Sequence, residues 1–463
     1  MNITLIQPYF DSHIVAPPLG LGYLAAALKK AGHSVTIIDC VLKDIAIDAL
    51  PRVVGGGFPD IIGLSIYSNY YTEARQAINA LRSHLDAPIV IGGPHVSALP
   101  DFSLTDTGAD FAIVGEGEDS FVRLVTMLEA KGSDYGSIPG VYYFDRKNKS
   151  VVKNPERRYR EDISSLSWPA WDLLRPDRYP PAPHGALYRR FPVAPVITTR
   201  GCVYNCLFCG ACAIWGKEIR RRNHVEIVDE IEYLTKEFNI REIQFEDDNI
   251  TFFKEHVYDL CNEIIRRKID IVWSCPNGVR VDTIDKEMLK VMKASGCYLL
   301  SFGIESGSQE ILDAMGKRLR LDLVRDVITL VKRSGIETWG FFIIGLPGET
   351  RTTARKTIDF ARSLPLDRAQ FCNFTPLPGT RIFDDWTKGK RLSEIAWSDL
   401  NFSNKSLYST PGLSSDEINA LQRQAFRAFY LRPRILLKIV LKIKIGQIKW
   451  LIKRILAYSY FKR

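Results

Sequence analysis

The sequence predicts an α/β protein built from two successive units of alternating strands and helices, followed by a helical carboxyl-terminal tail. Two observations support this prediction. Short β-branched and aliphatic runs alternate with helical segments as far as about residue 390. Polar and glycine residues gather where the apolar runs end, as they do at the carboxyl edges of parallel sheets. We therefore divide the chain into residues 1–132, 133–192, 193–390 and 391–463.

The first unit is predicted to be a Rossmann-like, doubly wound domain. Its five expected strands are Ile3–Gln7, Val35–Ile38, Ile61–Ile66, Ile89–Ile91 and Phe111–Val114. A domain of this kind binds its ligand at the carboxyl edge of the sheet. The candidate ligand-binding residues in the loops at that edge are Pro18, Leu19, Gly20, Ser65, Tyr67, Ser68, Gly92, Gly93, Pro94, His95, Gly115, Glu116, Gly117 and Glu118.

A dinucleotide site is one alternative for this edge, because Gly20-Leu-Gly22 lies at the start of the first helix. The G-x-G-x-x-G fingerprint is incomplete, since Ala25 stands at the third glycine position and Pro17 and Pro18 precede the helix. The two glycines alone are therefore weak support for NAD.

Residues 193–390 are predicted to form a partial (β/α)6 barrel of the TIM type. The six expected strands are Val193–Thr199, Ile240–Phe245, Ile271–Cys275, Tyr298–Ile304, Trp339–Ile344 and Gln370–Phe374. Helical spacing predicts helices over Val225–Phe238, Glu255–Arg267 and Glu287–Ala294. The six strand ends should surround one mouth. The preceding residues 133–192 are rich in proline and aromatic residues and predict an extended connector, whose aromatic side chains either pack or line a substrate cavity.

Three cysteines follow the first barrel strand, with the spacing C-x3-C-x2-C at Cys202, Cys206 and Cys209. Three thiolates on one short loop can hold three irons of a [4Fe–4S] cube and leave the fourth iron open to another ligand. Cys212 adds a fourth thiol, so a closed zinc or iron site is the alternative. Structural zinc sites draw their ligands from two separated knuckles, which favours the open cluster here.

This loop, with Phe208 directly before its last cysteine, resembles the signature of the radical S-adenosylmethionine (SAM) enzymes. The resemblance implies that Cys202, Cys206 and Cys209 bind a [4Fe–4S] cluster and are catalytic. It also implies that SAM chelates the open iron and is cleaved, by one electron from the cluster, to a 5′-deoxyadenosyl radical. A flavodoxin- or ferredoxin-type protein would supply the electron.

Polar residues at the other strand ends are candidates for holding SAM in this resemblance. Carboxylates can accept hydrogen bonds from an ammonium or a ribose, an arginine can pair with a carboxylate, and glycines permit close approach of the backbone. The candidates are Glu246, Asp247, Asp248, Arg280, Glu305, Ser306, Gly307 and Gly345. The family's usual Gly-Gly-Glu is replaced here by Glu246-Asp247-Asp248, so which carboxylate binds SAM stays open, and some of these residues could instead be turn or capping residues.

The first unit also carries a resemblance. The segments Pro-Pro-Leu-Gly-Leu-Gly-Tyr-Leu, Gly-Gly-Pro-His and Val-Gly-Glu-Gly-Glu, placed before such a barrel, resemble the cobalamin-binding domain of the cobalamin-dependent radical SAM enzymes. Cobalamin is then the third cofactor. Methionine-synthase-like domains supply a histidine to cobalt from Asp-x-His-x-x-Gly, and Asp11-Ser-His13-Ile-Val-Ala16 matches this motif except at the glycine. Because Pro17 and Pro18 lengthen the loop, we expect no histidine ligand, with His13 and His95 as the alternatives.

The tail is strongly basic. Residues 418–463 contain twelve Lys or Arg and no Asp or Glu, so the net charge of +9 becomes 9 − 12 = −3 for the rest of the chain. A helical wheel places Lys438, Lys442, Lys449 and Lys453 on one stripe beside apolar residues. This pattern predicts peripheral contact of residues 432–463 with an anionic membrane. Packing on the barrel and binding of nucleic acid are the alternatives, and nucleic acid is the least favoured.

These features predict a cytoplasmic enzyme, with a peripheral position on the inner face of the membrane as the alternative. The nine cysteines are odd in number, and neither a signal peptide nor an uncharged spanning stretch is apparent. The main prediction is a C-methyltransferase that acts on an unactivated carbon through a 5′-deoxyadenosyl radical and methylcobalamin. An oxidative cyclase or rearrangement enzyme for a tetrapyrrole or lipid is the alternative, and a non-catalytic electron carrier is a third class. The substrate, a small molecule or a lipid, is not specified by the barrel residues.

Overall fold

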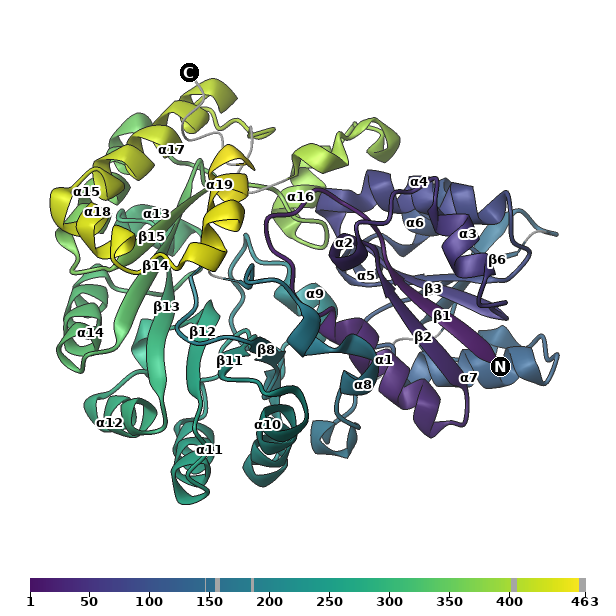
Figure 1. The fold of residues 1–463 in the computed structure, drawn as a ribbon. Coiled ribbons are helices and arrows are strands. Elements are labelled where there is room, and N and C mark those ends of the chain that lie inside the picture. The colour runs from purple at the N-terminus through teal and green to yellow at the C-terminus, as the bar shows by residue number, and fades with distance from the viewer. Residues whose placement is uncertain (146, 155–158, 185–186, 401–405, 458–463) are drawn as a thin grey trace.

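The structure is a computed structural model that describes the chain except for residues 146, 155–158, 185–186, 401–405 and 458–463. Two α/β units lie side by side, with the amino-terminal unit on the right of Figure 1 and the barrel on the left. The predicted fold class and the order of the two units are therefore confirmed.

The first sheet has seven strands in the order β2-β1-β3-β4-β5-β6-β7. Its five parallel strands match the five predicted from sequence: β1 (Asn2–Gln7), β2 (Ser34–Asp39), β3 (Ile61–Ser65), β4 (Ile89–Gly92) and β5 (Phe111–Ile113). They are short and rich in aliphatic residues because both faces of a parallel sheet are covered. The strand order reverses between β1 and β3, which is where such sheets bind their ligands.

Helices cover both faces of this sheet, so the domain is doubly wound as predicted (Figure 1). One face packs against α1 (Leu19–Lys30) and α7 (Glu118–Glu129), through residues such as Leu28 and Phe121. The other face packs against α3, α4 and α6, through residues such as Ile78. The remaining helices of this half are α2 (Cys40–Lys43), α3 (Leu50–Gly55), α4 (Tyr71–Arg82), α5 (Pro94–Ala98), α6 (Pro100–Thr107) and α8 (Trp171–Leu174).

The segment predicted as an extended connector differs from that prediction in its first third. There, β6 (Val141–Asp145) and β7 (Ser150–Lys153) form an antiparallel hairpin that extends the first sheet from β5. The rest of the connector lies across both units. Trp171 is buried, and its Nε1 donates to Glu230 Oε1 at 2.8 Å, so this aromatic side chain packs instead of lining a cavity.

The second sheet has six parallel strands in the order β15-β14-β13-β12-β11-β8 and forms an incomplete barrel. All six predicted strands are confirmed: β8 (Val193–Val196), β11 (Glu242–Phe245), β12 (Val272–Val279), β13 (Cys297–Glu305), β14 (Glu337–Ile344) and β15 (Arg368–Asn373). The outer helices are α10 (His224–Phe238), α11 (Lys254–Arg266), α12 (Lys286–Ala294), α13 (Gln309–Ala314), α14 (Leu321–Arg333) and α15 (Arg351–Ser363). A small antiparallel ribbon, β9 (Thr199–Arg200) with β10 (Arg220–Arg221), flanks the cysteine loop and its short helix α9 (Ala211–Trp215).

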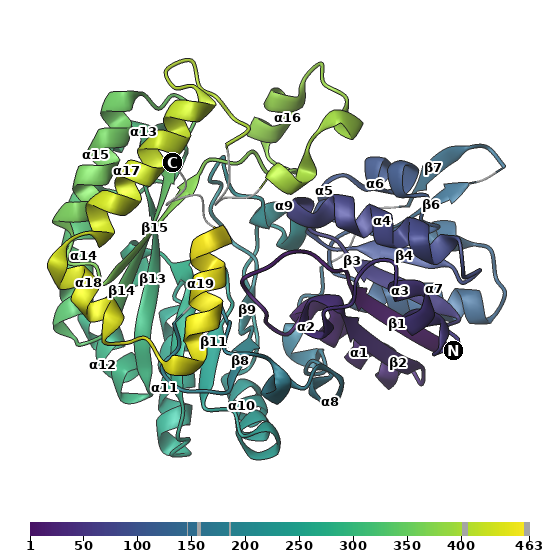
Figure 2. The ribbon, with the colours of Figure 1, turned by 45° about the horizontal axis from the view of Figure 1, so that its top comes forward.

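The carboxyl-terminal region covers the open side of the barrel (Figure 2). After α16 (Arg381–Thr387), the helix α17 (Ser415–Tyr430) packs against β15, and α18 (Pro433–Val440) and α19 (Ile448–Ala457) follow. The helical wheel of the sequence assumed one continuous helix, whereas the break between α18 and α19 places Lys438 and Lys449 on different helices. In the described part of the chain, no helix combines the length and apolar character needed to cross a membrane.

Candidate active site

The cysteine loop lies at the mouth of the barrel and is held at both ends. Gly201 adopts φ 101°, and a Cβ there would lie 1.9 Å from the carbonyl oxygen of Glu218, so only glycine fits before Cys202. The amide of Leu207 donates to the carbonyl of Met315 at 3.0 Å, and Phe208 packs near the buried Phe374. The loop is therefore anchored to the ends of several barrel strands.

The thiols of Cys202, Cys206 and Cys209 are free, and burial raises the pKa of each of them. Among the described residues, no three His, Cys, Asp or Glu side chains are arranged so that they could hold a metal ion as they stand. The donor set nevertheless suits an iron–sulfur cluster, because three free thiols share one loop. The thiol of Cys212 donates to the backbone of the same loop, with its Sγ 3.4 Å from the carbonyl of Tyr204 and 3.6 Å from that of Cys202.

The three acidic residues after β11 have three different surroundings. Asp247 is buried and accepts hydrogen bonds from the amides and hydroxyls of Thr198 and Thr199, at 3.0 Å for the Thr198 amide. Burial raises its pKa to about 6. Asp247 therefore fixes the chain just before the cysteine loop through Oδ1, while its Oδ2 is buried without a hydrogen-bond partner among the described residues. Its contact with a cofactor stays a prediction.

The charge of Asp248 acts on both Cys202 and Cys209, so its carboxylate lies close to the cysteine loop. Desolvation, with the neighbouring Asp247 adding to it, raises the pKa of Asp248 to about 6. Of the three carboxylates, Asp248 is the one that faces the cysteine loop. Among the described contacts, no protein cation pairs with it.

Glu246 pairs with a residue that the sequence did not single out. Its Oε1 lies 2.8 Å from Nδ1 of His184, which comes from the connector. The charge of Glu246 also acts on Tyr67 of the first domain, whose pKa is raised by desolvation of its hydroxyl and by this carboxylate. The ligand edge of the first sheet therefore faces the barrel mouth at this point.

Glu305 and Arg280 also have protein partners. Glu305 Oε1 lies 2.9 Å from Lys317 Nζ, and that ammonium is 5.8 Å from the ring of Phe208. Arg280 pairs with Asp282 at 2.7 Å and lies over the ring of Tyr204 at 3.7 Å. Glu305 and Arg280, which were both predicted to contact SAM, are therefore paired with protein residues beside the cysteine loop in this structure.

Ser306, Gly307 and Gly345 are packed against neighbouring helices. The amide of Gly307 donates to Thr357 Oγ1 at 3.0 Å, and a Cβ on Gly307 would lie 2.6 Å from the Lys356 carbonyl oxygen. Gly345 adopts φ 92°, and its amide donates to Glu349 Oε2 at 2.5 Å. The prediction that these residues contact SAM is not supported by their internal contacts.

The buried carboxyl of Glu349 makes the stability of this turn depend on pH. Burial raises its pKa from 4.5 to about 7, so the native state holds this proton over a range in which the unfolded chain releases it. The contribution to stability is complete below pH 4.5 and is lost as the pH rises through about 7. Its size is about 3 kcal/mol.

We therefore expect the Tm of Glu349→Gln to fall less than the Tm of the parent as the pH rises from about 5 to about 8. The exposed Glu287→Gln is the control and should follow the parent at every pH. Identical pH profiles for Glu349→Gln and the parent would contradict the assignment.

The candidate cobalamin residues lie on the loops at the ligand edge of the first sheet, as predicted. Gly20 and Tyr67 are exposed there, while Ser65, Ser68 and Gly92 are half-buried. Pro18 precedes α1 as its N-cap and Leu19 begins that helix. Gly93 adopts φ 96°, and a Cβ there would lie 2.9 Å from the backbone of Ile66, so the loop requires glycine. Pro94 starts α5 immediately after this loop.

His95 is enclosed in the protein core next to this edge. Its ring stacks on Tyr71 at 4.2 Å and lies edge-on to Trp397 at 4.6 Å, and its Nδ1 is 3.0 Å from Ser68 Oγ. Burial lowers the pKa of His95 to about 3, so the ring is neutral. A cobalt ligand role for His95 is not supported by this enclosed position.

Glu116 and Glu118 are buried in ion pairs with arginines of the barrel. Arg200 lies 3.0 Å from Glu116 and 2.7 Å from Glu118, and Arg220 lies 2.7 Å from Glu116. The guanidinium of Arg200 also lies over the ring of Tyr23 at 4.8 Å. The two carboxylates, expected to bind a cofactor together with Gly115 and Gly117, thus link the first domain to the β9–β10 ribbon. We call these four charged residues the interdomain charge cluster.

Comparison with known proteins agrees with this architecture. The family model of the radical SAM superfamily matches residues 196–361, and that of the B12 binding domain matches residues 12–125. The uncharacterized methyltransferase PH0819 of Pyrococcus horikoshii is 34% identical over 95% of this chain and 94% of its own length. An anaerobic magnesium-protoporphyrin IX monomethyl ester cyclase of Rubrivivax gelatinosus is 28% identical over 87% of this chain and 72% of its own length.

A solved structure has the same fold. The radical S-adenosylmethionine methyltransferase TsrM from Kitasatospora setae, with cobalamin and a [4Fe-4S] cluster bound, superposes with a TM-score of 0.74. It is 19% identical and covers 92% of this chain and 90% of its own. The incomplete barrel with its cysteine loop and the doubly wound sheet facing it define a radical enzyme with a separate cofactor-binding domain. The chain belongs to the cobalamin-dependent radical SAM enzymes, whose cofactors are a [4Fe–4S] cluster, SAM and cobalamin.

Proposed function

We propose that this enzyme is a C-methyltransferase that acts on an unactivated carbon of a small molecule. The observation that carries the proposal is the juxtaposition of the two sites: Tyr67, at the ligand edge of the first sheet, lies within the electrostatic reach of Glu246 at the barrel mouth. When bound, the cluster and SAM supply a 5′-deoxyadenosyl radical, and cobalamin supplies a methyl group. A substrate between these sites would be reached from both sides.

Different residues of the protein would bind the cluster, SAM, cobalamin and the substrate. Cys202, Cys206 and Cys209 would hold the cluster, and Asp248 would accept hydrogen bonds from the methionyl ammonium of SAM. Gly20, in the first turn of α1, and the glycine loop at Gly93 would receive the corrin. His184 and Glu246, which lie between the two domains, would donate or accept hydrogen bonds with polar groups of the substrate. A flavodoxin- or ferredoxin-type protein of the reducing cytoplasm would supply the electron.

An oxidative cyclase is the second candidate. The similarity to the Rubrivivax gelatinosus cyclase spans most of both chains and is what favours it. A cyclase would remove hydrogens from its substrate without adding a methyl group. Both functions need the same radical, so the fate of the SAM methyl group separates them.

The test uses the reconstituted full-length enzyme with dithionite, SAM labelled with ¹³C in its methyl group, and a small-molecule extract. We expect 5′-deoxyadenosine and an extract component that gains one labelled methyl group on carbon, measured by mass spectrometry. Asp248→Asn should raise the KM for SAM about tenfold, because one charge-assisted hydrogen bond is weakened. A product that loses hydrogens and carries no label would establish the cyclase instead, and no 5′-deoxyadenosine would exclude both.

A further inference from the structure

The helix α18 is amphipathic, but its apolar face points away from the protein. A helix on the surface of a water-soluble domain normally buries its apolar face and exposes its charges. In α18 and the residue after it, Leu436, Leu437, Val440 and Leu441 are all exposed, with 61% of Leu437 and 75% of Leu441 accessible. Their spacing of i, i+1, i+4 and i+5 places them on one side of the helix.

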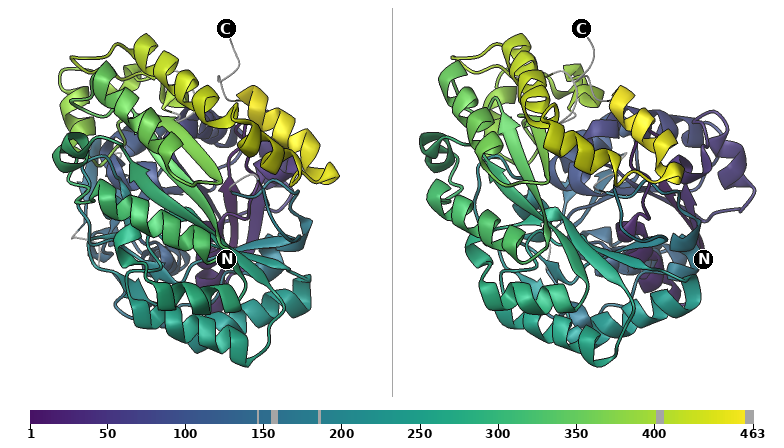
Figure 3. Two further views of the ribbon diagram at one scale, coloured as in Figure 1. Left: turned by 90° about the vertical axis from the view of Figure 1, so that its left-hand side faces the viewer. Right: turned by 60° about the vertical axis from the view of Figure 1, so that its left-hand side comes forward.

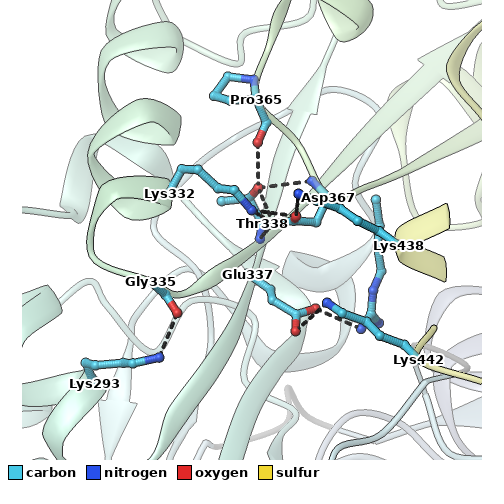
Figure 4. A network of polar contacts seen from close by, with 10 residues as sticks. Lys293, Lys332, Gly335, Glu337, Thr338, Pro365, Asp367, Lys438 and Lys442 are labelled. Atoms are coloured by element: carbon cyan, nitrogen blue, oxygen red, sulfur yellow. Dashed lines mark hydrogen bonds and ion pairs between the residues drawn. The ribbon is translucent and has the colours of Figure 1, made fainter. Parts of the chain in front are cut away.

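The opposite side of α18 carries the residues that attach it to the barrel. Ile435 is buried, Lys438 Nζ lies 3.2 Å from Asp367 Oδ1, and Lys442 Nζ lies 2.7 Å from Glu337 Oε1. Figure 4 shows both lysines reaching these carboxylates, with Lys332 meeting Asp367 from the other direction. These ion pairs fix the orientation of the helix, so the exposure of the leucines is not a consequence of a loosely attached segment.

The carboxylates in question lie where two barrel strands begin. Glu337 is the first residue of β14, and Asp367 directly precedes β15. The cysteine loop lies at the opposite, carboxyl end of the barrel strands. Whatever covers α18 is therefore separated from the reacting groups by the length of the barrel.

The exposed apolar surface is concentrated in this part of the molecule. Among the described residues, nine of the seventeen exposed large apolar side chains lie between Leu431 and Ile452. They continue beyond α18 through Ile445, which is 89% accessible, to Ile448 and Ile452 of α19. Figure 3 shows α17, α18 and α19 following one another along one surface. We call the exposed apolar residues from Leu431 to Ile452 the tail face.

The charges carried by the tail itself are all basic. Arg427, Arg434 and Lys449 are exposed, and residues 418–463 contain no acidic residue. The carboxylates that lie against α18, Asp367 and Glu337, are paired with Lys438 and Lys442. Basic residues beside a shallow layer of Leu and Ile are complementary to an anionic bilayer, which offers phosphates above an apolar interior. A large exposed apolar patch marks an interaction site and not an ordinary surface.

We propose that the tail face is a peripheral membrane-binding surface specific for anionic lipid. Its leucines and isoleucines enter the interface, and the exposed arginines and Lys449 meet the headgroups. Lys438 and Lys442, in contrast, hold the helix to the protein. This differs from the arrangement expected from the helical wheel, in which these two lysines faced the lipid. The surface requires neither cofactor, so it is independent of the proposed reaction.

The test is co-sedimentation of the full-length enzyme with vesicles of phosphatidylcholine alone and of phosphatidylcholine mixed with phosphatidylglycerol. The parent should bind the mixed vesicles, and Leu437→Glu/Leu441→Glu should weaken that binding about tenfold or more, since two charges replace inserted leucines. The control is Phe58→Glu, which alters an equally exposed aromatic residue of the first domain, 82% accessible, and should bind as the parent does.

Equal sedimentation of the parent and Leu437→Glu/Leu441→Glu would overturn the proposal, as would equal binding of the parent to both kinds of vesicle. A dimer in solution that the double substitution abolishes, without vesicle binding, would assign the tail face to a second copy of the chain and also overturn it. Formation of 5′-deoxyadenosine by the variant checks that the enzyme is folded.

Discussion

Replacement of Arg200 by methionine is expected to lower the free energy of unfolding by about 3 to 5 kcal/mol, because it leaves Glu118 buried without its arginine and Glu116 with Arg220 alone. The side chain of Arg200 is 4% exposed, and those of Glu116 and Glu118 are 6% and 10% exposed. Burial alone would raise the pKa of Glu118, but Arg200 outweighs it and holds that pKa below 4.5. Chemical denaturation of the reconstituted enzyme measures the loss.

Arg190→Met provides the matched control for this prediction. Arg190, like Arg200, pairs with a carboxylate: its partner is Asp270, at 2.6 Å. The two side chains are 42% and 73% exposed, so this pair lies in solvent. An exposed ion pair contributes about 1 kcal/mol or less. If Arg200→Met costs no more than Arg190→Met, the interdomain charge cluster does not hold the two domains together.

Arg200→Met should also affect the site of the iron–sulfur cluster. Arg200 is two residues before Cys202. Gly201, which lies between them, packs closely against the carbonyl of Glu218, so a displacement of Arg200 would be passed on to Cys202. We therefore expect Arg200→Met to lower the iron content after reconstitution as well as the stability. Normal iron content in a destabilised variant would show that the cysteine loop is positioned without Arg200.

Cys206→Ala is expected to abolish cleavage of SAM, whereas Cys212→Ala is expected to retain it. A three-iron attachment cannot survive the loss of one of its three thiolates, while a fourth thiol outside the site is dispensable. In the structure the Sγ of Cys212 lies 3.4 Å from the carbonyl of Tyr204. Iron content and 5′-deoxyadenosine formation, measured on both variants after identical reconstitution, give the two readouts.

The two cysteine variants also decide between an open and a closed cluster. Loss of cleavage in Cys206→Ala with full cleavage in Cys212→Ala supports three ligands. Equal loss in both would favour a closed site with four thiolates and remove the open iron on which the proposed chemistry depends.

The strands were predictable because parallel sheets are buried on both faces. Runs such as Ile3–Gln7 and Ile61–Ile66 are dominated by isoleucine and leucine, and four consecutive residues are buried in each strand. The hairpin of β6 and β7 was missed, although Val141–Asp145 is rich in β-forming residues, because prolines and glycines on either side dominated the prediction. Local composition indicated a connector, whereas pairing with β5 made a strand.

The partners of the acidic residues were not predictable. Glu116 and Glu118 stand in a loop at the ligand edge, where a cofactor contact is the natural expectation. Their arginine lies 84 and 82 residues away in the sequence, and nothing in either segment indicates the pairing. His184 was missed for the same reason, since its partner Glu246 is 62 residues distant.

The tail illustrates a different limit. Periodicity correctly indicated amphipathic helices, but it does not state which face a helix presents to its own protein. That choice depends on Asp367 and Glu337, which lie outside the tail and attract its lysines. The direction in which α18 faces therefore became known only from the structure.

The interdomain charge cluster also bears on the order of synthesis. Glu116 and Glu118 leave the ribosome well before Arg200 and Arg220, because the chain is made from its amino terminus. Until the β9–β10 ribbon has been translated and docked, both carboxylates lack their arginines and stay hydrated. The first domain can therefore fold before the barrel, but Glu116 and Glu118 become buried only when the strand that precedes the cysteine loop has docked.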